Sequence, residues 1–265
     1  MTQHIGTPKA QSEMVALFVS DIHLQGQMPA TTRAFLAFLT GPARHTEQLY
    51  LLGDLFEYWA GDDDIDAPFN RAIVDALRAL SDAGIAVFWI AGNRDFLVGD
   101  GFAKATGATL LTDGTVMQLA GQRIVLAHGD AQCTDDIDYI TFRNQVRQPA
   151  WQQQFLAMPL QRRKAIIDDL RKQSRVAQQG KQSEIMDVNP AAIAALFASS
   201  GTTQMIHGHT HRPATHTLQD VAGNVATRYV LPDWDCDTLP VRGGWLGLDH
   251  AGVICRYGLA YLHSD

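Results

Sequence analysis

Short apolar runs recur along most of the chain, and each of them stops abruptly at a polar residue. Apolar runs of this length, bounded by Gly, Asp, Asn or His, are typical of strands that are buried on both faces. Because several of them follow one another with other segments between, a sheet is expected. The sequence predicts strands at 15–20, 48–53, 86–92, 123–129 and 203–209.

Segments with helical spacing of apolar residues separate the first of these strands. They lie at 31–40 and at 67–84, and the second closes with a glycine of the kind that ends helices. Alternation of strand and helix predicts parallel strands. Later, short alternating runs such as 226–231 and 252–259 indicate antiparallel strands. We therefore predict an α/β fold, a layered sandwich of mixed β-sheets flanked by helices.

Residues 134–185 interrupt this rhythm. The segment is rich in Gln and Arg, and its apolar residues recur at the spacing of a helix face. We predict one domain over 1–265, with 134–185 inserted as a helical lid. The apolar residues at helical spacing are Phe155, Leu156, Leu160, Ile166, Ile167 and Leu170.

The composition is that of a folded globular protein, with 46% hydrophobic and 18% charged residues. A formal net charge of −7 argues against nucleic acid as a partner, because phosphate backbones are bound mainly by Lys and Arg. Three cysteines without a CxxC pair favour a reducing compartment. The stretch 160–181 is the basic exception, with seven basic residues against two acidic ones: Arg162, Arg163, Lys164, Arg171, Lys172, Arg175 and Lys181 against Asp168 and Asp169.

Side chains able to bind metal follow all five predicted strands. In an open α/β sheet the loops at the carboxyl ends of strands converge on one edge, so these side chains are expected to meet. Taken singly, a strand-end Asp can also be a helix cap or a turn former. Together the set offers carboxylate, amide and imidazole ligands, which suit Mn, Fe or Zn, and it is large enough for two ions. Its members are Asp21, His23, Asp54, Asn93, His128, His209 and His211.

The order of these motifs carries a resemblance. Asp-x-His, Gly-Asp, Gly-Asn, a single His and Gly-His-x-His follow one another as in the calcineurin-like metallophosphoesterase superfamily. The resemblance implies two divalent metal ions that share Asp54. One would bind Asp21, His23, Asp54 and His211, and the other Asp54, Asn93, His128 and His209. His207 falls outside the pattern and is interpreted as a strand residue or as a residue that supports one of the ligands.

Arg94 departs from the superfamily pattern, where His commonly follows the Asn. Arginine does not release its proton near neutral pH, so it cannot act as a general acid. A leaving group that needs no proton is therefore expected, and a phosphate released from a pyrophosphate is such a group. A guanidinium can bind its growing charge through two hydrogen bonds.

Longer segments resemble one branch, the UDP-2,3-diacylglucosamine pyrophosphohydrolase family of lipid A biosynthesis. They are GDLFEYWAGDDD, AGNRDFLVG, HGDAQCTDDIDY, IMDVN and IHGHTHRPATH. The resemblance implies that water activated by two metal ions, usually Mn, attacks the α-phosphorus of UDP-2,3-diacylglucosamine. The products would be UMP and 2,3-diacylglucosamine 1-phosphate. It also implies substrate contacts at Asn93, Arg94, Asp136, Ser174, Gln178, Lys181 and His209, with Asn93, Arg94 and His209 at the reacting group. Gln178 stands where the family can have Asn.

The predicted helical lid would cover the acyl chains, and its basic stretch would lie on the anionic inner-membrane surface. This implies a peripheral protein on the cytoplasmic face of the inner membrane of a Gram-negative bacterium, with no obligate protein partner. The alternative for the stretch is a solvated helix face. Alternatives for the whole chain are a soluble nucleotide pyrophosphatase or phosphodiesterase, and a non-catalytic scaffold, which would be expected to lose ligands.

Three further features of the sequence receive a structural interpretation, and one segment receives none. Asp130 is expected to orient His128, and Cys133 to be a buried packing residue. The adjacent carboxylates at 62–64 are interpreted as a solvated turn, and no role is assigned to 231–248.

Overall fold

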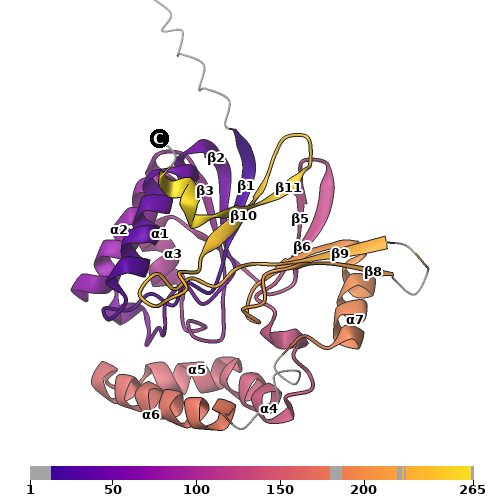
Figure 1. Ribbon diagram of the computed structural model, residues 1–265. Coiled ribbons are helices and arrows are strands. Elements are labelled where there is room, and N and C mark those ends of the chain that lie inside the picture. The colour runs from indigo at the N-terminus through magenta and orange to yellow at the C-terminus, as the bar shows by residue number, and fades with distance from the viewer. Residues whose placement is uncertain (1–12, 180–186, 220–222, 224, 264–265) are drawn as a thin grey trace, which may run out of the picture.

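The computed structural model describes residues 13–179, 187–219, 223 and 225–263, and it shows two mixed β-sheets packed against each other (Figure 1). Within these residues the first sheet has six strands in the order β11-β10-β1-β2-β3-β4. Strands β1, β2, β3 and β4 are parallel, and β10 pairs antiparallel with β1. Its strands are β1 (Met14–Val19), β2 (Thr46–Leu51), β3 (Ala86–Ile90), β4 (Thr109–Leu111), β10 (Gly244–Leu248) and β11 (Ile254–Gly258).

The second sheet has the order β5-β6-β7-β9-β8 within the described part of the chain. Its central strands β6, β7 and β9 are parallel, while β5 and β8 pair antiparallel at the edges. Both sheets are therefore mixed, as the sequence predicts. The strands are β5 (Thr115–Leu119), β6 (Gln122–Leu126), β7 (Gln204–His207), β8 (Thr215–Gln219) and β9 (Val225–Val230).

Alternate residues of the first sheet face two different cores, because successive side chains of a strand point to opposite faces. Phe18 and Tyr50 pack between the two sheets, whereas Leu17 and Leu49 pack beneath the helices on the outer face. Continuous burial on both faces explains why these strands appear in the sequence as unbroken apolar runs.

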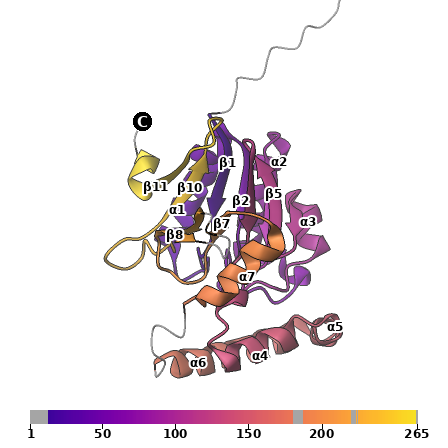
Figure 2. The same cartoon turned by 90° about the vertical axis from the view of Figure 1, so that its right-hand side faces the viewer.

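Helices cover the outer faces of both sheets. The first sheet is covered by α1 (Pro29–Thr40), α2 (Pro68–Asp82) and α3 (Asp100–Thr106), and the second by α7 (Pro190–Ser200) (Figure 2). The helices predicted at 31–40 and 67–84 are α1 and α2, and the five predicted strands are β1, β2, β3, β6 and β7. The prediction of a layered α/β sandwich is confirmed.

A separate helical layer lies beyond the carboxyl ends of the parallel strands, at the bottom of Figure 1. It consists of α4 (Ile137–Val146), α5 (Pro149–Leu156) and α6 (Leu160–Gln179), and these helices occupy most of the segment 134–185. Within the described part of the chain, none of the helices combines the length and the apolar composition that spanning a bilayer requires.

The interpretation of residues 62–64 as a solvated turn is wrong. They form a short 3-10 helix, and two of its carboxylates pair with basic side chains of the helical layer. Asp63 pairs with Arg163 of α6, and Asp64 pairs with Lys164 at 2.7 Å. Asp62 accepts hydrogen bonds from the Trp59 indole and the Phe102 backbone amide. Asp63 and Asp64 look solvated in sequence because their partners lie a hundred positions away in the chain.

The segment 231–248, to which no role is assigned from sequence, holds the first sheet and α1 together. Strand β10 pairs with β1 in the middle of the sheet, and Trp234 and Trp245 are buried in the core. The Asp237 carboxylate accepts hydrogen bonds from the backbone amides of Ala30 and Thr31 in the first turn of α1.

Candidate metal centre

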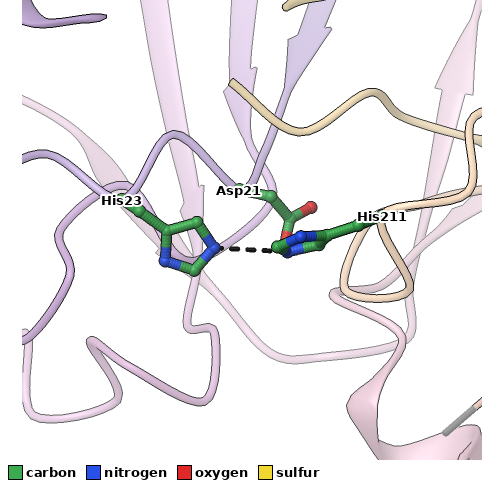
Figure 3. A group of neighbouring side chains, drawn as sticks. All are labelled: Asp21, His23 and His211. Atoms are coloured by element: carbon green, nitrogen blue, oxygen red, sulfur yellow. Dashed lines mark hydrogen bonds and ion pairs between the residues drawn. The ribbon is translucent and has the colours of Figure 1, made fainter. Parts of the chain in front are cut away.

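The loops after β1 and β7 bring three of the predicted ligands together. Asp21, His23 and His211 each offer a ligand atom, and these atoms all lie within 4.8 Å of one another (Figure 3). His23 Nε2 is 3.3 Å from His211 Nε2, and His211 Nε2 is 3.5 Å from Asp21 Oδ1. Imidazole nitrogens that face each other in this way are placed to share one cation.

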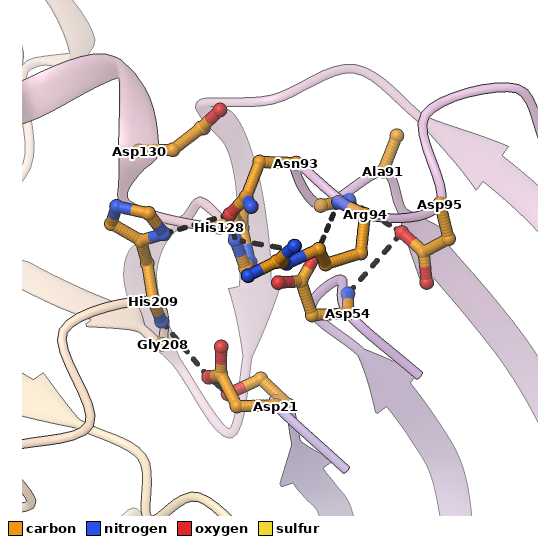
Figure 4. A network of polar contacts seen from close by, with 12 residues as sticks. Asp21, Asp54, Ala91, Asn93, Arg94, Asp95, His128, Asp130, Gly208 and His209 are labelled. Carbon is orange, nitrogen blue, oxygen red and sulfur yellow. Dashed lines mark hydrogen bonds and ion pairs between the residues drawn. The ribbon is translucent and has the colours of Figure 1, made fainter. Parts of the chain in front are cut away.

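A second group lies beside the first, at the ends of β3, β6 and β7 (Figure 4). Asn93 Oδ1 is 3.0 Å from His128 Nε2 and 2.9 Å from His209 Nδ1. Asp54 stands between the groups, with Oδ2 3.9 Å from His23 Nε2 and Oδ1 3.7 Å from His128 Nε2. The structure thus brings all seven predicted residues to one edge, with Asp54 placed where a bridging carboxylate would lie.

Five of these seven residues have a left-handed backbone. Positive φ angles near 50–70° occur at Asp21, His23, Asp54, His209 and His211, and among the described non-glycine residues the only other such case is Ala120. This conformation costs an L-residue on the order of 1–2 kcal/mol and is concentrated at functional sites. The sharp turns carry the side chains back over the strand ends.

The charges of the site fit divalent cations. Asp21 is fully buried and Asp54 nearly so, and Asp21 Oδ1 makes no hydrogen bond. The Nδ1 proton of His128 is donated to the Leu52 carbonyl at 2.8 Å. A neutral ring would present its Nε2 lone pair to Asn93 Oδ1, another acceptor 3.0 Å away, so this pair requires a positive charge, either a proton on Nε2 or a cation between the two atoms. Buried carboxylates and opposed acceptors are the environment that a cation stabilises.

Two pKa shifts in the site follow from burial and from the neighbouring charges. Burial disfavours the imidazolium of His128, but the nearby carboxylates of Asp54 and Asp21 outweigh it and raise its pKa to about 9. For His209, burial and the positive charge on His128 lower the pKa to about 4, so this ring is neutral at pH 7 and its nitrogens can act as ligands.

The interpretation of Asp130 as the partner of His128 is wrong, because the Leu52 carbonyl occupies that position. Asp130 instead accepts hydrogen bonds from the Tyr139 hydroxyl at 2.6 Å and from Arg143 Nε at 2.8 Å, both on α4. His207 is the last residue of β7, buried against Arg228, as predicted for a strand residue. Cys133 is buried, which confirms its interpretation as a packing residue.

Asp95 is a site residue that the sequence reasoning missed, although it closes the quoted motif GNRD. Its buried carboxylate accepts hydrogen bonds from the backbone amides of Gly92 at 2.9 Å and Leu55 at 2.8 Å. It therefore ties together the loops that carry Asp54 and Asn93. Burial and the charge of Asp54 raise its pKa to about 7.

The remaining predicted substrate contacts have different outcomes. Asp136 lines a cavity of about 320 Å³ at the metal centre and accepts the Tyr139 backbone amide at the start of α4. Ser174 and Gln178 belong to α6, and their side chains are not among the described ones. Lys181 lies outside the described residues. For these three, the contact stays a prediction.

A second cavity, of about 460 Å³, opens from the metal centre toward the helical layer. One end is formed by Asn93, Arg94 and His209, which also line the first cavity. The remainder of its wall is largely aromatic and aliphatic, and comes from both the sandwich and the helical layer: Tyr58, Trp59, Phe96, Leu97, Phe142, Trp151, Phe155, Ile167 and Leu170.

Residues 14–213 match the family model of the calcineurin-like phosphoesterases. The chain belongs to this family. It is 50% identical over 247 residues to the UDP-2,3-diacylglucosamine hydrolase of Aromatoleum aromaticum, covering 92% of this chain and 98% of the relative. The protein of the same name from Cellvibrio japonicus is 48% identical over 221 residues, covering 83% of this chain and 91% of the relative. All seven predicted ligands fall within the part that matches the calcineurin-like phosphoesterases.

Solved structures with a similar chain course include an archaeal phosphodiesterase. It has a TM-score of 0.45 and 11% sequence identity, with 92% of this chain and 98% of that chain covered. A Pseudomonas putida nuclease gives a TM-score of 0.40 at 16% identity, covering 91% of this chain and 87% of that chain.

Proposed function

We propose that the protein hydrolyses the diphosphate of UDP-2,3-diacylglucosamine to UMP and 2,3-diacylglucosamine 1-phosphate, a step of lipid A biosynthesis. The observation that carries the proposal is the apolar cavity that opens onto the candidate metal centre through Asn93, Arg94 and His209. The diphosphate of this substrate would lie at the polar metal centre, and its two acyl chains would lie in the adjoining apolar cavity. Relatives about half identical in sequence carry the corresponding name.

The seven ligands would hold two divalent cations; their mixed nitrogen and oxygen donors are compatible with Mn, Fe or Zn, and we propose Mn as the native ion because the family resemblance implies it. When bound, such a pair lowers the pKa of water and offsets charge on the phosphoryl oxygens. Asp21, His23, Asp54 and His211 would hold one cation. Asp54, Asn93, His128 and His209 would hold the other.

Arg94 is placed to bind the diphosphate. Its Nε is buried without a hydrogen bond, and its side chain lines both cavities. Its backbone amide donates to Asp54 Oδ1 at 2.8 Å, which fixes the residue relative to the metal centre. The guanidinium would stabilise the charge that develops on the leaving phosphate, while Asn93 and His209 contact the same group. No side chain needs to protonate that leaving group.

The apolar cavity would bind the acyl chains. Each methylene transferred from water to such a surface contributes about 0.8 kcal/mol, so two acyl chains outweigh the sugar in affinity. The substrates of a soluble nucleotide pyrophosphatase carry no acyl chains that would pack against Phe96, Trp151 and Leu170 of the cavity wall. The cavity therefore favours the lipid substrate over this alternative.

We also propose that the helical layer lies on the cytoplasmic face of the inner membrane. Several of its apolar side chains face solvent, including Ile137, which is 74% exposed, and Leu156, which is 40% exposed. Three of the seven predicted basic residues bind the sandwich instead, namely Arg163, Lys164 and Arg171. Apolar insertion would then contribute more than charge, and sedimentation with anionic vesicles should persist largely in high salt.

The test of the reaction compares two substrates after metal has been removed and Mn restored. UDP-2,3-diacylglucosamine should be cleaved only with Mn, and oxygen-18 from water should appear in UMP. UDP-N-acetylglucosamine, which lacks the acyl chains, should be a poor substrate. Equal cleavage of both compounds would establish the soluble pyrophosphatase instead.

A further inference from the structure

Glu57 lies outside the predicted ligand set, yet its carboxylate contacts both a metal-site histidine and the helical layer. Its Oε2 lies 3.0 Å from His23 Nδ1, within hydrogen-bonding distance, and its Oε1 accepts a hydrogen bond from Arg171 of α6 at 2.5 Å. The side chains of His23, Glu57 and Arg171 are each only 15–16% exposed. A chain of three shielded polar groups thus connects the sandwich edge to α6.

The contact with Glu57 would control the tautomer and the orientation of the His23 ring. The ring presents Nε2 to the centre, 3.3 Å from His211 Nε2, so Nδ1 carries the proton when Nε2 binds a cation. A carboxylate that accepts this proton fixes the tautomer and the ring orientation, and it makes the other nitrogen a better ligand. The Arg171 guanidinium, which donates to the other carboxylate oxygen, favours the ionised form of Glu57 that can accept this proton.

Arg171 in turn holds Glu57 from the helical layer. Its guanidinium lies 5.4 Å from the centroid of the Tyr58 ring and 3.6 Å from Asp168 on its own helix, so its direction is constrained. Arg171, Glu57 and Tyr58 all line the apolar cavity. The group that holds the carboxylate is therefore part of the wall that acyl chains would touch.

We infer that Glu57 is a positioning residue for His23, and that Arg171 keeps Glu57 in place from the helical layer. Cation affinity at the place bounded by Asp21, His23 and His211 then depends on the docking of α6 against the sandwich. By thermodynamic linkage, any change that stabilises the docking of α6 also increases the affinity for this cation. This role rests on the proposed metal centre and not on the identity of the lipid.

The test titrates metal-free protein with Mn and follows the free ion by electron paramagnetic resonance. Wild type should bind two ions. Glu57→Gln should weaken one of them by about 10–100-fold and leave the other unchanged. Arg171→Met should weaken the same ion by a smaller factor, and Arg171→Lys should recover part of the loss. The matched control is Lys172→Met, because Lys172 is 69% exposed and pairs only with Asp169 of its own helix in the described part of the chain.

Thermal unfolding without metal separates positioning from general damage. A purely structural role would lower the melting temperature and weaken both ions together, which would overturn the inference. Wild-type affinity of Glu57→Gln for both ions would also overturn it while leaving the metal centre intact. If Arg171→Met bound both Mn ions with wild-type affinity, the role assigned to Arg171 of α6 would be wrong. Failure of the wild type to bind Mn would instead contradict the metal centre itself.

Discussion

The sandwich edge and the helical layer border the same cavities but are held in place by different forces. Loops at the edge are joined through their backbones: the amide of Asp21 donates to the Gly53 carbonyl at 3.1 Å, and that of Gly208 to the His128 carbonyl at 2.9 Å. The helical layer is attached through side chains: charged ones such as those of Lys164 and Arg171, and apolar ones such as that of Phe155, which is buried in the core of the sandwich. Backbone bonds give cation ligands a fixed geometry, whereas side-chain ties allow a cover to adapt to flexible acyl chains.

Among the tests of this comparison, removing the bridging charge at the sandwich edge should have the largest effect on turnover. Asp54→Asn keeps the shape of the side chain but leaves both cations without their shared carboxylate. We expect turnover to fall by more than the roughly 100-fold that loss of an outer contact causes, with metal content below two ions per chain. Metal analysis and kinetics with Mn check this. Asp75→Asn, on an exposed acid of α2, is the control. Two tightly bound ions in Asp54→Asn would contradict the bridging assignment.

The helical layer should respond in affinity for lipid and not in metal content. Leu170→Ala removes part of the cavity wall, and because Leu170 is partly exposed the loss is about 1 kcal/mol, or roughly a fivefold rise in KM for the diacyl substrate. Leu156→Ala is a matched control, since Leu156 has similar exposure but is not part of the cavity wall. Equal effects of both variants on KM would argue against acyl binding there.

The ties between the two regions can be tested separately. Asp64→Asn removes the charge that Lys164 binds at 2.7 Å, and since Lys164 is 26% exposed the cost is discounted to about 1 kcal/mol. Amide hydrogen exchange should accelerate in α6 and stay unchanged in β1 and β2. Asp169→Asn, which breaks an exposed pair on the same helix, should change neither. Unaltered exchange in α6 would show that this tie does not hold the layer.

Cys133 should give the smallest effect, although it lies close to the metal centre. Burial, followed by the nearby carboxylates, raises the pKa of its thiol to about 12, so it has about a thousandfold less thiolate at pH 8 than a thiol of ordinary pKa 9. Iodoacetamide should modify the exposed Cys255 in the folded protein and spare Cys133, as mass spectrometry can show. Rapid labelling of Cys133, or loss of turnover in Cys133→Ala, would point to a chemical role.

The ligand set could be predicted because each ligand directly follows a buried strand, and strand ends meet wherever parallel strands do. The same rule could not identify Glu57 or Asp95. Both stand within three residues of a ligand, but their roles in the site depend on which atoms their carboxylates contact in the folded chain. The Leu52 carbonyl that orients His128 is a backbone group, and no side-chain pattern records it.

Contacts of the helical layer were beyond sequence reasoning for a different reason. Asp63 and Asp64 each pair with a residue a hundred positions away, and a carboxylate that looks solvated in its own segment gives no sign of such a partner. Strand β10 was missed because its glycines weaken the strand pattern, although all five of its residues are buried.

The placement of β10 sets the order in which a newly made chain can assemble its centre. Every proposed ligand has been translated once residue 211 is made, but the edge of β1 next to Asp21 stays unpaired until residues 244–248 arrive. Trp234, whose amide donates to the Asp21 carbonyl at 2.9 Å, is also made after all the ligands. A chain translated as far as residue 211 would therefore carry the full set of donors beside an edge of β1 that is still unpaired.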